Sequence, residues 1–600
     1  MHRLGFVLTL TILFQIAGPA AWGGDSPSAA PPAASAGPNT PDEMKLELQK
    51  LKQQIAALEE RINAQEKQPP SPAPAQPQPA SDLVADVKDL DKRVSQTERG
   101  QAMDRVRFTG DFRFEAHAIL GKIPSHYDGM VLQNLLVKSM FAMAILGRPP
   151  ASVAEINNTV ASHYGDYQFF TNNLTFNQLK QGMASMPAGL QQQLMGMLMP
   201  STFVQGYTAN NDALFTNRLR LNIDAQVADN VSFTGRLSMY KVFGDSTGVQ
   251  VFNGQPTSMN IDGTTAGVPN SDQLRVERAY FSWNNIANSK LYLSIGRRPS
   301  TGGPPMNYRQ DELRSVTPSG ALIDYQFDGI TVGYKFSENM IWRLCWGLGY
   351  ESGFGNGSLL KLPQDRLKDT HFLGANLDLW NTDTTLIQAT YAHAFNVTDG
   401  FDGLMVLPTN PLTGDPVPAP VVMRYTPSAN LGGIHLFGMN VTQRAKAFDL
   451  YASGNLSATR PNGVTTPFGG LLSDPFETPV NHTGYMGLGG IRFNAPWNDG
   501  HTKLGFEFNH GSQYWFNFAQ ASDDIIAPKT NTRGNVFEAY LTHRISERFI
   551  FKGDFIKYVY NYSGSGWHVG APKALDSQPV LGFPTYDGAS MVSVGLISRF

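Results

Sequence analysis

Hydrophobic and polar side chains alternate along several segments of the chain, beginning near residue 105. Over 106–115, apolar residues or glycine occupy every second position, and the positions between them hold Arg107, Thr109, Asp111, Arg113 and Glu115. The same period returns over 218–227 and, after an Asp229-Asn230 turn, over 231–238. Successive side chains of a β-strand point to opposite faces, so each segment predicts a strand with one apolar and one charged face. A soluble sandwich seldom buries such charges, whereas a membrane barrel has lipid outside and water inside.

Applied to the rest of the chain, this pattern predicts an all-β fold, a sixteen-stranded antiparallel transmembrane β-barrel. The expected strands cover 105–118, 214–227, 231–243, 274–284, 290–298, 321–336, 341–350, 370–380, 384–395, 431–443, 447–457, 484–494, 503–512, 535–545, 549–562 and 589–600. Within 321–336 the apolar parity switches near Asp328-Gly329, which we interpret as a β-bulge because a hairpin would give an odd number of strands. Short turns alternate with long loops, as in outer-membrane barrels.

Aromatic residues gather at the predicted strand ends. Those next to short turns are Trp283, Trp342, Trp380 and Trp497, and those at the opposite ends are Tyr350, Trp515 and Tyr562. Membrane barrels typically carry two belts of aromatic residues, one at each membrane interface. The pattern therefore predicts contact with outer-membrane lipid.

The N-terminal 104 residues follow other patterns. Residues 1–23 predict a secretory signal peptide, 24–40 a disordered linker, 69–81 a proline-rich linker and 82–104 a second short coiled coil. Residues 41–68 carry a heptad repeat and predict a coiled coil whose seam includes Leu48, Leu51, Ile55, Leu58 and Ile62. Because so short a helix is unstable alone, we expect it to form an oligomer, and an amphipathic helix packed on its own barrel is the alternative. In the periplasm the coiled coil could also contact the cell wall.

Composition excludes several classes of function. Charged residues make up 16% of the 600 residues and the net charge is −3, which argues against a nucleic-acid partner. After the N-terminus we find no run of about 18 apolar residues, which argues against a helical membrane protein. The single cysteine, Cys345, excludes internal disulfides, Cys-rich zinc sites and c-type haem attachment. The histidines are dispersed, so we expect no metal site, no cofactor and no catalytic residues, and therefore no enzyme.

The barrel portion, 105–600, resembles the general and phosphate-selective porins of Gram-negative bacteria. The resemblance is carried by the opening strand Arg107–Glu115, by Val276–Phe281, by Ile295-Gly296-Arg297-Arg298 before a Gly/Pro-rich loop, and by the terminal Phe600. The whole layout is similar to an uncharacterised family of outer-membrane porins with an N-terminal coiled coil. The resemblance implies a water-filled diffusion channel, usually a homotrimer, whose third loop narrows the pore. Segment 299–319 has that position, and Phe600 implies recognition by the barrel-assembly machinery.

Opposed charges are the candidate site of this channel. We expect the lumen and its constriction to be lined by Arg107, Arg113, Arg218, Arg220, Arg236, Arg298, Asp311 and Glu312. Asp311 and Glu312 would face Arg218, Arg220 and Arg236, and a transverse field across confined water would orient solutes and set ion preference. The alternative is a set of solvated or mutually paired wall charges.

A long insertion, 119–213, departs from the porin pattern. Residues 130–146 and 187–199 predict helices, and the methionines between Met130 and Met199 are explained by a helical core or by a soft-metal site. The insertion could plug the pore, cap it or contact a partner. The function predicted is therefore passive diffusion of small hydrophilic solutes or ions, with a plugged barrel acting as an interaction, envelope-tethering or electron-conduit scaffold as the alternative.

Overall fold

The computed structural model describes residues 49–50, 52–57, 59–60, 105–244, 267, 269, 271–355, 359–363, 367–400, 403–409, 416–425, 427–576, 579–582 and 585–600. Residues 52–57 are helical and Ile55 is half-buried. The other predicted seam residues, Leu48, Leu51, Leu58 and Ile62, lie outside the described residues. So do the predicted signal peptide, both linkers and the second short coiled coil, all of which stay predictions.

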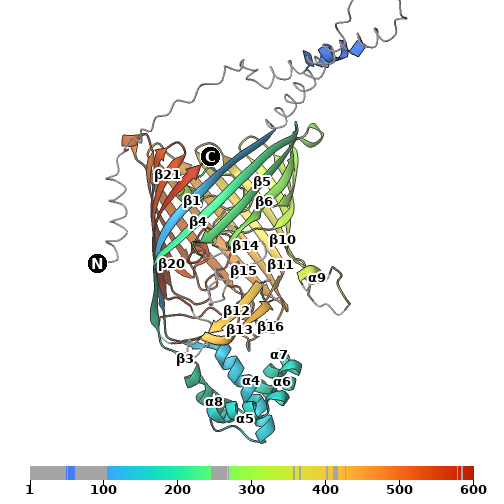
Figure 1. The fold of residues 1–600 in the computed structure, drawn as a ribbon, viewed down its shortest axis with the longest axis vertical. Helices are drawn as coiled ribbons and strands as arrows, with labels where there is room; N and C mark the ends of the chain where they lie inside the picture. The colour runs from blue at the N-terminus through green and yellow to red at the C-terminus, as the bar shows by residue number, and fades with distance from the viewer. Residues whose placement is uncertain are drawn as a thin grey trace, which may run out of the picture. The chain divides into compact units, whose positions relative to one another are not determined.

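Sixteen strands form one closed antiparallel barrel (Figure 1). They are β1 (Val106–Ile123), β4 (Tyr207–Ala228), β5 (Val231–Val242), β6 (Ser271–Trp283), β7 (Leu291–Arg297), β8 (Asp328–Lys335), β9 (Ile341–Tyr350), β10 (Thr370–Asn381), β11 (Thr385–Thr398), β14 (Asn430–Arg444), β15 (Phe448–Pro461), β18 (Thr483–Asn494), β19 (Thr502–Gly511), β20 (Gly534–Ser546), β21 (Phe549–Tyr560) and β23 (Gly588–Arg599). The last strand closes the barrel on the first, with Phe112 opposite Ser598. The number and order of strands predicted from the sequence are confirmed.

One predicted strand was wrong in its extent. The strand expected over 321–336 begins only at Asp328, and its pairing with β7 and β9 continues from there without a register shift, so there is no bulge at Asp328-Gly329. Residues 321–327 belong to the preceding loop, where Ala321 and Leu322 are completely buried. An apolar run buried in a loop has the same composition as a strand, which explains the error.

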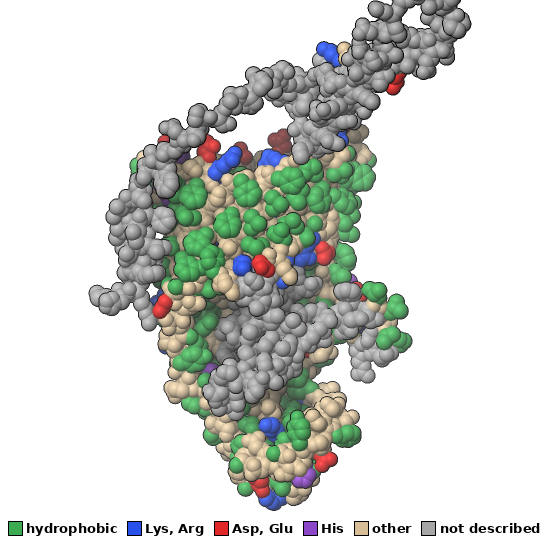
Figure 2. Space-filling view, in the orientation of Figure 1, with side chains coloured by type: hydrophobic (Ala, Val, Ile, Leu, Met, Phe, Trp, Pro, Cys, Tyr) green, Lys and Arg blue, Asp and Glu red, His purple; other side chains and the backbone are tan. Residues whose placement is uncertain are grey.

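Alternation separates the two faces of each strand. On β1, Phe108 and Phe112 are exposed, whereas Arg113, Glu115 and His117 are at most 5% exposed. Exposed apolar side chains form a broad band around the visible face of the barrel, and charged side chains lie along its rim (Figure 2). Polarity is therefore reversed relative to a soluble protein, as the sequence predicted.

The aromatic pattern is correct at one end of the barrel and partly wrong at the other. The tryptophans next to short turns are all exposed: Trp283, Trp342, Trp380 and Trp497. At the opposite end, Tyr350 is buried and Trp515 is completely buried, with its Nε1 donating to Thr530 O at 2.7 Å. Trp515 belongs to a loop that turns inward, so it cannot contribute to an interfacial ring.

The insertion between β1 and β4 is a small helical domain (Figure 1). Its elements are β2 (His126–Asp128), α4 (Gly129–Leu146), α5 (Val153–Ser162), α6 (Tyr164–Asn173), α7 (Phe176–Ser185), α8 (Ala188–Leu198), η1 (Met199–Thr202) and β3 (Phe203–Val204). Asp128 caps α4 by accepting from Met130 N and Val131 N, and Gly147 ends it with φ 64°. Helices α4 and α8 cover the two segments in which the sequence predicts helices.

Helix α4 is long and apolar enough to cross a membrane, judged by length and composition alone. Its 18 residues have a mean hydropathy of 1.6, so the expectation that no such run follows the N-terminus was wrong. Leu132, Leu135 and Leu136 of this helix pack against Ile156, Leu194 and Leu198, with several methionines around them. Burial against α5 and α8 explains the apolar composition, and the methionines fill this core.

The remaining short elements lie within the loops that connect the barrel strands. They are η3 (Ile286–Asn288), η4 (Tyr308–Gln310), α9 (Ser352–Gly355), β12 (Gly403–Thr409), β13 (Pro416–Tyr425), β16 (Thr465–Thr466), β17 (Gly469–Gly470), η5 (Pro496–Asn498), η6 (Lys529–Asn531) and β22 (Val580–Gly582). Strands β12 and β13 pair only with each other, and β2 pairs with β22 and β3.

The chain divides into two compact units, Met1–Thr109 with Asn222–Phe233, and Gly110–Leu221 with Thr234–Phe600. In the first, Gln226 N donates to Arg105 O at 2.9 Å and Asn222 Nδ2 to Thr109 Oγ1 at 3.3 Å. Arg107 belongs to this unit and is exposed. The two inward loops, their ion pairs and the helical insertion belong to the second unit.

Candidate functional site in the barrel lumen

The β7–β8 loop, residues 298–327, reaches across the inside of the barrel. Arg314 pairs with Asp378 on β10 at 3.2 Å, and Arg309 pairs with Glu538 on β20 at 3.5 Å. On β23, two strands from β20, Arg599 Nη2 donates to the backbone oxygen of Asp311 at 3.2 Å. Because β10 and β23 lie across the barrel from each other, contacts with both strands place this loop in the lumen.

A second inward loop, the β19–β20 loop of residues 512–533, packs against the first. Asp324 N donates to Phe518 O at 2.7 Å, and Ala521 N donates to Asp324 O at 2.8 Å. Asn517 Nδ2 donates to Ala321 O at 2.8 Å. The alternating pattern of the sequence does not predict this inward loop, although its Trp515–Ala519 run is unusually apolar for a segment outside the strands.

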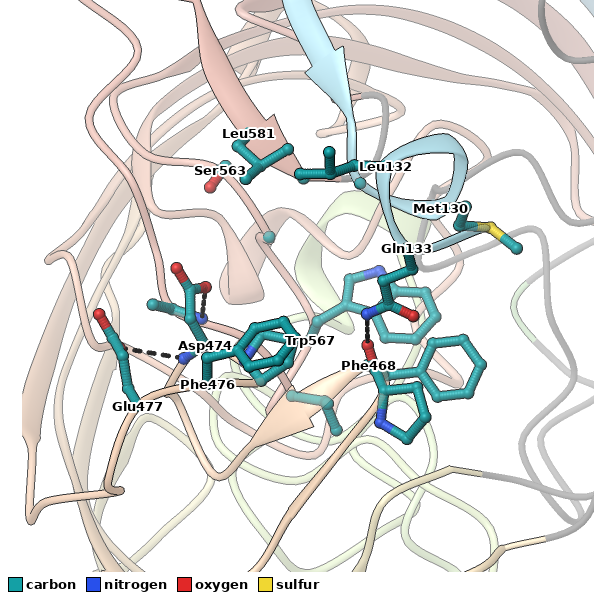
Figure 3. A pocket seen from close by; sticks show the side chains of 18 of the residues that line it. Met130, Leu132, Gln133, Phe468, Asp474, Phe476, Glu477, Ser563, Trp567 and Leu581 are labelled. Carbon is teal, nitrogen blue, oxygen red and sulfur yellow. Dashed lines mark hydrogen bonds between the residues drawn. The ribbon is translucent and has the colours of Figure 1, made fainter. Parts of the chain in front are cut away.

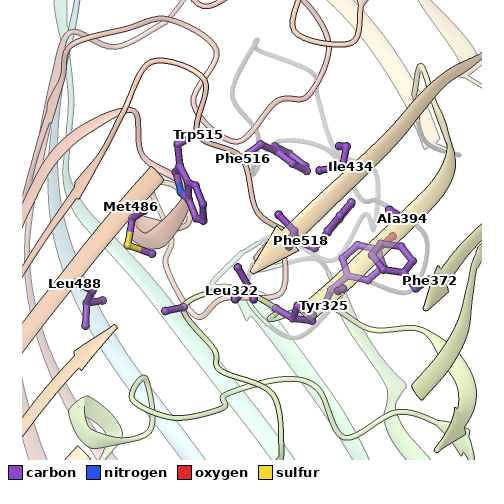
Figure 4. Packing of buried hydrophobic residues seen from close by; sticks show 14 of the residues in the cluster. Leu322, Tyr325, Phe372, Ala394, Ile434, Met486, Leu488, Trp515, Phe516 and Phe518 are labelled. Carbon is purple, nitrogen blue, oxygen red and sulfur yellow. The ribbon is translucent and has the colours of Figure 1, made fainter. Parts of the chain in front are cut away.

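An apolar cluster forms where the two loops meet the wall (Figure 4). Leu322, Trp515 and Phe518 come from the loops, and Phe372 and Ile434 point inward from β10 and β14. Phe372 and Phe518 meet edge to face at 4.5 Å between ring centroids. Strands β10, β11, β14 and β18 therefore contribute apolar residues to this cluster, where the loops cover them.

Asp523 of the β19–β20 loop is held by two of the predicted arginines. Arg113 Nη2 donates to Asp523 Oδ1 at 2.8 Å, and Arg218 Nη1 donates to Oδ2 at 2.8 Å. Arg218 also pairs with Asp111 at 3.2 Å, and Arg113 pairs with Glu115 at 3.0 Å. Burial alone would raise the pKa of the Asp523 carboxyl, but the arginines hold it well below its ordinary value.

Glu312 and Glu277 pair with the other predicted arginines. Arg220 Nη1 donates to Glu312 Oε1 at 3.3 Å, so this predicted pair is brought together. Arg236 contacts Glu277 on β6 at 3.2 Å, and Arg220 lies 3.8 Å from the same carboxylate. Glu277 is completely buried and also accepts from Thr301 Oγ1 at 2.7 Å.

Asp311 contacts β18, β19 and β20, whereas the sequence predicted contacts with the arginines of β4 and β5. It contacts Arg492 at 3.2 Å, Arg544 at 3.5 Å and Lys503, which lie on β18, β20 and β19. The expectation that it faces Arg218, Arg220 and Arg236 was wrong, because the loop carries Asp311 and Glu312 toward different sides. Burial would raise the pKa of Asp311, but these cations lower it.

A third charge cluster closes around Lys529, which is 1% exposed. Its Nζ contacts the carboxylates of Glu507 on β19 and Glu538 on β20. Arg309 joins the cluster through Asp524 at 2.5 Å. Burial would lower the pKa of Lys529, but the two glutamates raise it above its ordinary value. The sequence did not predict these ion pairs, which join Lys529 to the wall and Asp524 to the other loop, because both residues look like ordinary loop charges.

Arg298 borders a small cavity between the β7–β8 loop and the wall. Its Nη2 donates to Thr331 Oγ1 at 2.8 Å, and its guanidinium lies 5.6 Å from the centre of the Tyr280 ring. The cavity has a volume of about 220 Å³ and is also lined by Arg343 and Cys345. Nearby, burial raises the pKa of Asp324 to about 7, although Gly302 N donates to it at 3.3 Å. Among the described residues, no group of three His, Cys, Asp or Glu side chains is placed to hold a metal.

Comparison with known families gave one match. The profile of a family described as a protein of unknown function, DUF3373, matches residues 208–592. No curated protein matches the chain in sequence.

Structural comparison matched solved outer-membrane porins and channels at low sequence identity. The anion-selective porin from Comamonas acidovorans is 8% identical, with 82% of this chain and 99% of that chain covered and a TM-score of 0.38. The outer membrane channel DcaP of Acinetobacter baumannii is 10% identical, with 82% and 97% covered and a TM-score of 0.35. Salmonella typhi OmpF, solved in complex with daunomycin, is 9% identical over the same shares, with a TM-score of 0.36.

Proposed function

The chain belongs to the DUF3373 family of proteins of unknown function, and we propose that it is an outer-membrane channel for passive diffusion of small hydrophilic solutes or ions. One observation carries the proposal. The barrel is closed, with exposed apolar side chains such as Phe108 and Phe112 outside and side chains of charged residue types such as Arg113, Arg218 and Glu277 inside. Lipid requires such an exterior, and water-borne solutes require such an interior.

The setting follows from this polarity. The exposed tryptophans beside the short turns belong at one lipid interface. These tryptophans and the band of exposed apolar side chains contact outer-membrane lipid. In this arrangement the coiled coil is periplasmic, within reach of the cell wall, and Phe600 is the signal for the barrel-assembly machinery. The insertion and the long loops then face outward from the cell.

A second function is favoured by a specific observation. Two inward loops meet in an apolar cluster and bind the wall through buried ion pairs such as Arg309–Glu538 and Lys529–Glu538. A lumen filled in this way suits a plugged barrel that acts as an interaction, envelope-tethering or electron-conduit scaffold. In that case the plug is formed by the loops and not by the insertion.

Planar bilayers distinguish these functions. The channel is expected to give stable unitary conductance when the purified full chain is inserted. A correctly folded barrel that stays silent would contradict the channel and favour the scaffold.

Ion selectivity tests the residues assigned to the constriction. Neutralising Asp311 and Glu312 together (Asp311→Asn, Glu312→Gln) is expected to shift the reversal potential toward anions. The shift is expected to be larger at low salt than at high salt, because added salt screens the charges of the pore. Replacing Arg218 and Arg220 with glutamine is expected to shift it toward cations. Asp383→Asn, in a short turn, is the matched control. If neither pair changes the reversal potential of a conducting channel, the constriction lies elsewhere.

We also propose a homotrimer joined through the coiled coil, with Ile55 and its heptad neighbours in the seam. Deleting 41–100 is expected to lower the oligomer mass to that of the barrel alone, because apolar heptad positions lose their partners. Light scattering in detergent, corrected for bound detergent, measures this mass. An unchanged oligomer would mean that the barrel walls associate without the coiled coil.

A further inference from the structure

An apolar cavity lies between the helical insertion and the long loops (Figure 3). Its volume is about 760 Å³, within the range of pockets that hold small organic ligands. Leu132 and Gln133 of α4 line one side, and Phe468, Phe476 and Trp567 line the other.

Several contacts hold the walls of this cavity together. Gln133 Nε2 donates to Pro467 O, and Lys180 Nζ of α7 donates to Thr465 Oγ1 at 2.9 Å. The Phe176 and Phe476 rings lie 5.8 Å apart between centroids. Strands β2 and β22 also pair in parallel at the edge of the cavity, with Tyr127 opposite Leu581. The pocket is therefore built by the fold and needs no ligand to assemble it.

The charges that line the cavity are mainly negative. Asp399, Asp474 and Glu477 contribute carboxylates, and among the described residues that line the cavity Lys573 is the only cationic side chain. Lys573 is already engaged, because its Nζ lies 2.9 Å from Asp474 Oδ2 and donates to Leu581 O at 2.5 Å.

Glu477 is exposed and lies next to the aromatic rings. Its Oε2 accepts from Asp474 N at 3.1 Å, and among the described residues no cationic side chain lies within ion-pair distance of it. Figure 3 places Glu477, Asp474 and Phe476 side by side at one end of the pocket, with Trp567 beyond them.

We propose that this cavity binds an amphipathic organic cation, with its apolar body among Leu132, Phe468 and Trp567 and its ammonium group at Glu477. Aromatic faces and carboxylates both attract cations, and an apolar wall favours the rest of such a molecule. An anionic ligand would meet carboxylates without a free cation to pair with. The site is independent of whether the lumen conducts.

Three probes with one skeleton test the proposal: 6-phenylhexylammonium, 6-phenylhexanol and 6-phenylhexanoate. Titration calorimetry on the full chain in zwitterionic nanodiscs, with empty nanodiscs subtracted, gives the affinities. The ammonium probe is expected to bind about tenfold more tightly than the alcohol, and the carboxylate most weakly. Equal affinity for ammonium and alcohol, or preference for the carboxylate, would overturn the proposal.

Two variants assign the binding to this pocket. Glu477→Gln is expected to reduce the ammonium preference to about threefold or less while the alcohol binds as before. Phe476→Ala is expected to weaken all three probes, and Glu338→Gln, in the exposed β8–β9 turn, is the matched control. Heat-modifiable electrophoretic mobility reports that each barrel is folded. Unchanged preference in a folded Glu477→Gln barrel would place the cation elsewhere and overturn the assignment.

Discussion

Removing the inward part of the β19–β20 loop is expected to raise unitary conductance severalfold. Replacing 515–530 with a short Gly/Ser segment takes away Trp515 and Phe518, which fill the lumen beside Leu322, and also Asp523 and Lys529, which hold the loop on the wall. Because conductance scales with the open cross-section of the pore, this change is larger than any expected from a single charge. Single-channel recording in planar bilayers measures it.

The control is a loop whose strands do not pair with any strand of the barrel. Strands β12 and β13 form a separate two-stranded sheet, so replacing 403–425 in the same way is expected to leave the conductance nearly unchanged. If the folded 515–530 variant conducts no better than the wild type, the β19–β20 loop does not limit the pore. The β7–β8 loop would then be the next segment to shorten.

Replacing Lys529 with methionine is expected to release the β19–β20 loop. Methionine keeps much of the side-chain volume but leaves Glu507 and Glu538 buried without the ammonium group that neutralises them. Removing one partner of a buried ion pair costs about 3–5 kcal/mol. Hydrogen exchange at Ala521 N, which donates to Asp324 O at 2.8 Å, measures the free energy of loop opening. We expect its protection to fall by that amount.

A matched control and a rescue sharpen this experiment. Lys446→Met removes an exposed lysine from a short turn and is expected to leave the protection of Ala521 unchanged. Adding Glu538→Gln to Lys529→Met removes one of the two carboxylates that lost their ammonium partner. This second change is expected to restore part of the protection. Unchanged exchange in Lys529→Met would mean that the apolar cluster alone holds the loop.

The strands could be predicted because their signal is local. Lipid on one side and charged groups on the other force a two-residue period on each strand, as in Arg107–Glu115. In the structure, burial alternates residue by residue over 113–118 of β1 and 216–221 of β4. The parity of the strands and the length of each turn then fix the sheet order. Several candidate residues followed from the same period, including Arg113, Arg218 and Arg220, which the barrel buries and pairs.

The sequence by itself thus determined the barrel, the polarity of its walls and the arginines inside. Only the tertiary structure decided what fills the barrel. An apolar run such as 321–327 has the same composition in a strand as in a buried loop, and its position depends on Trp515 and Phe518, nearly 200 residues away. Ion-pair partners follow the same rule: Asp311 could meet any of many cations, and the path of its loop brings it to Arg492 and Arg544 rather than to Arg218. Charge attracts without direction, so its partners are chosen by the fold.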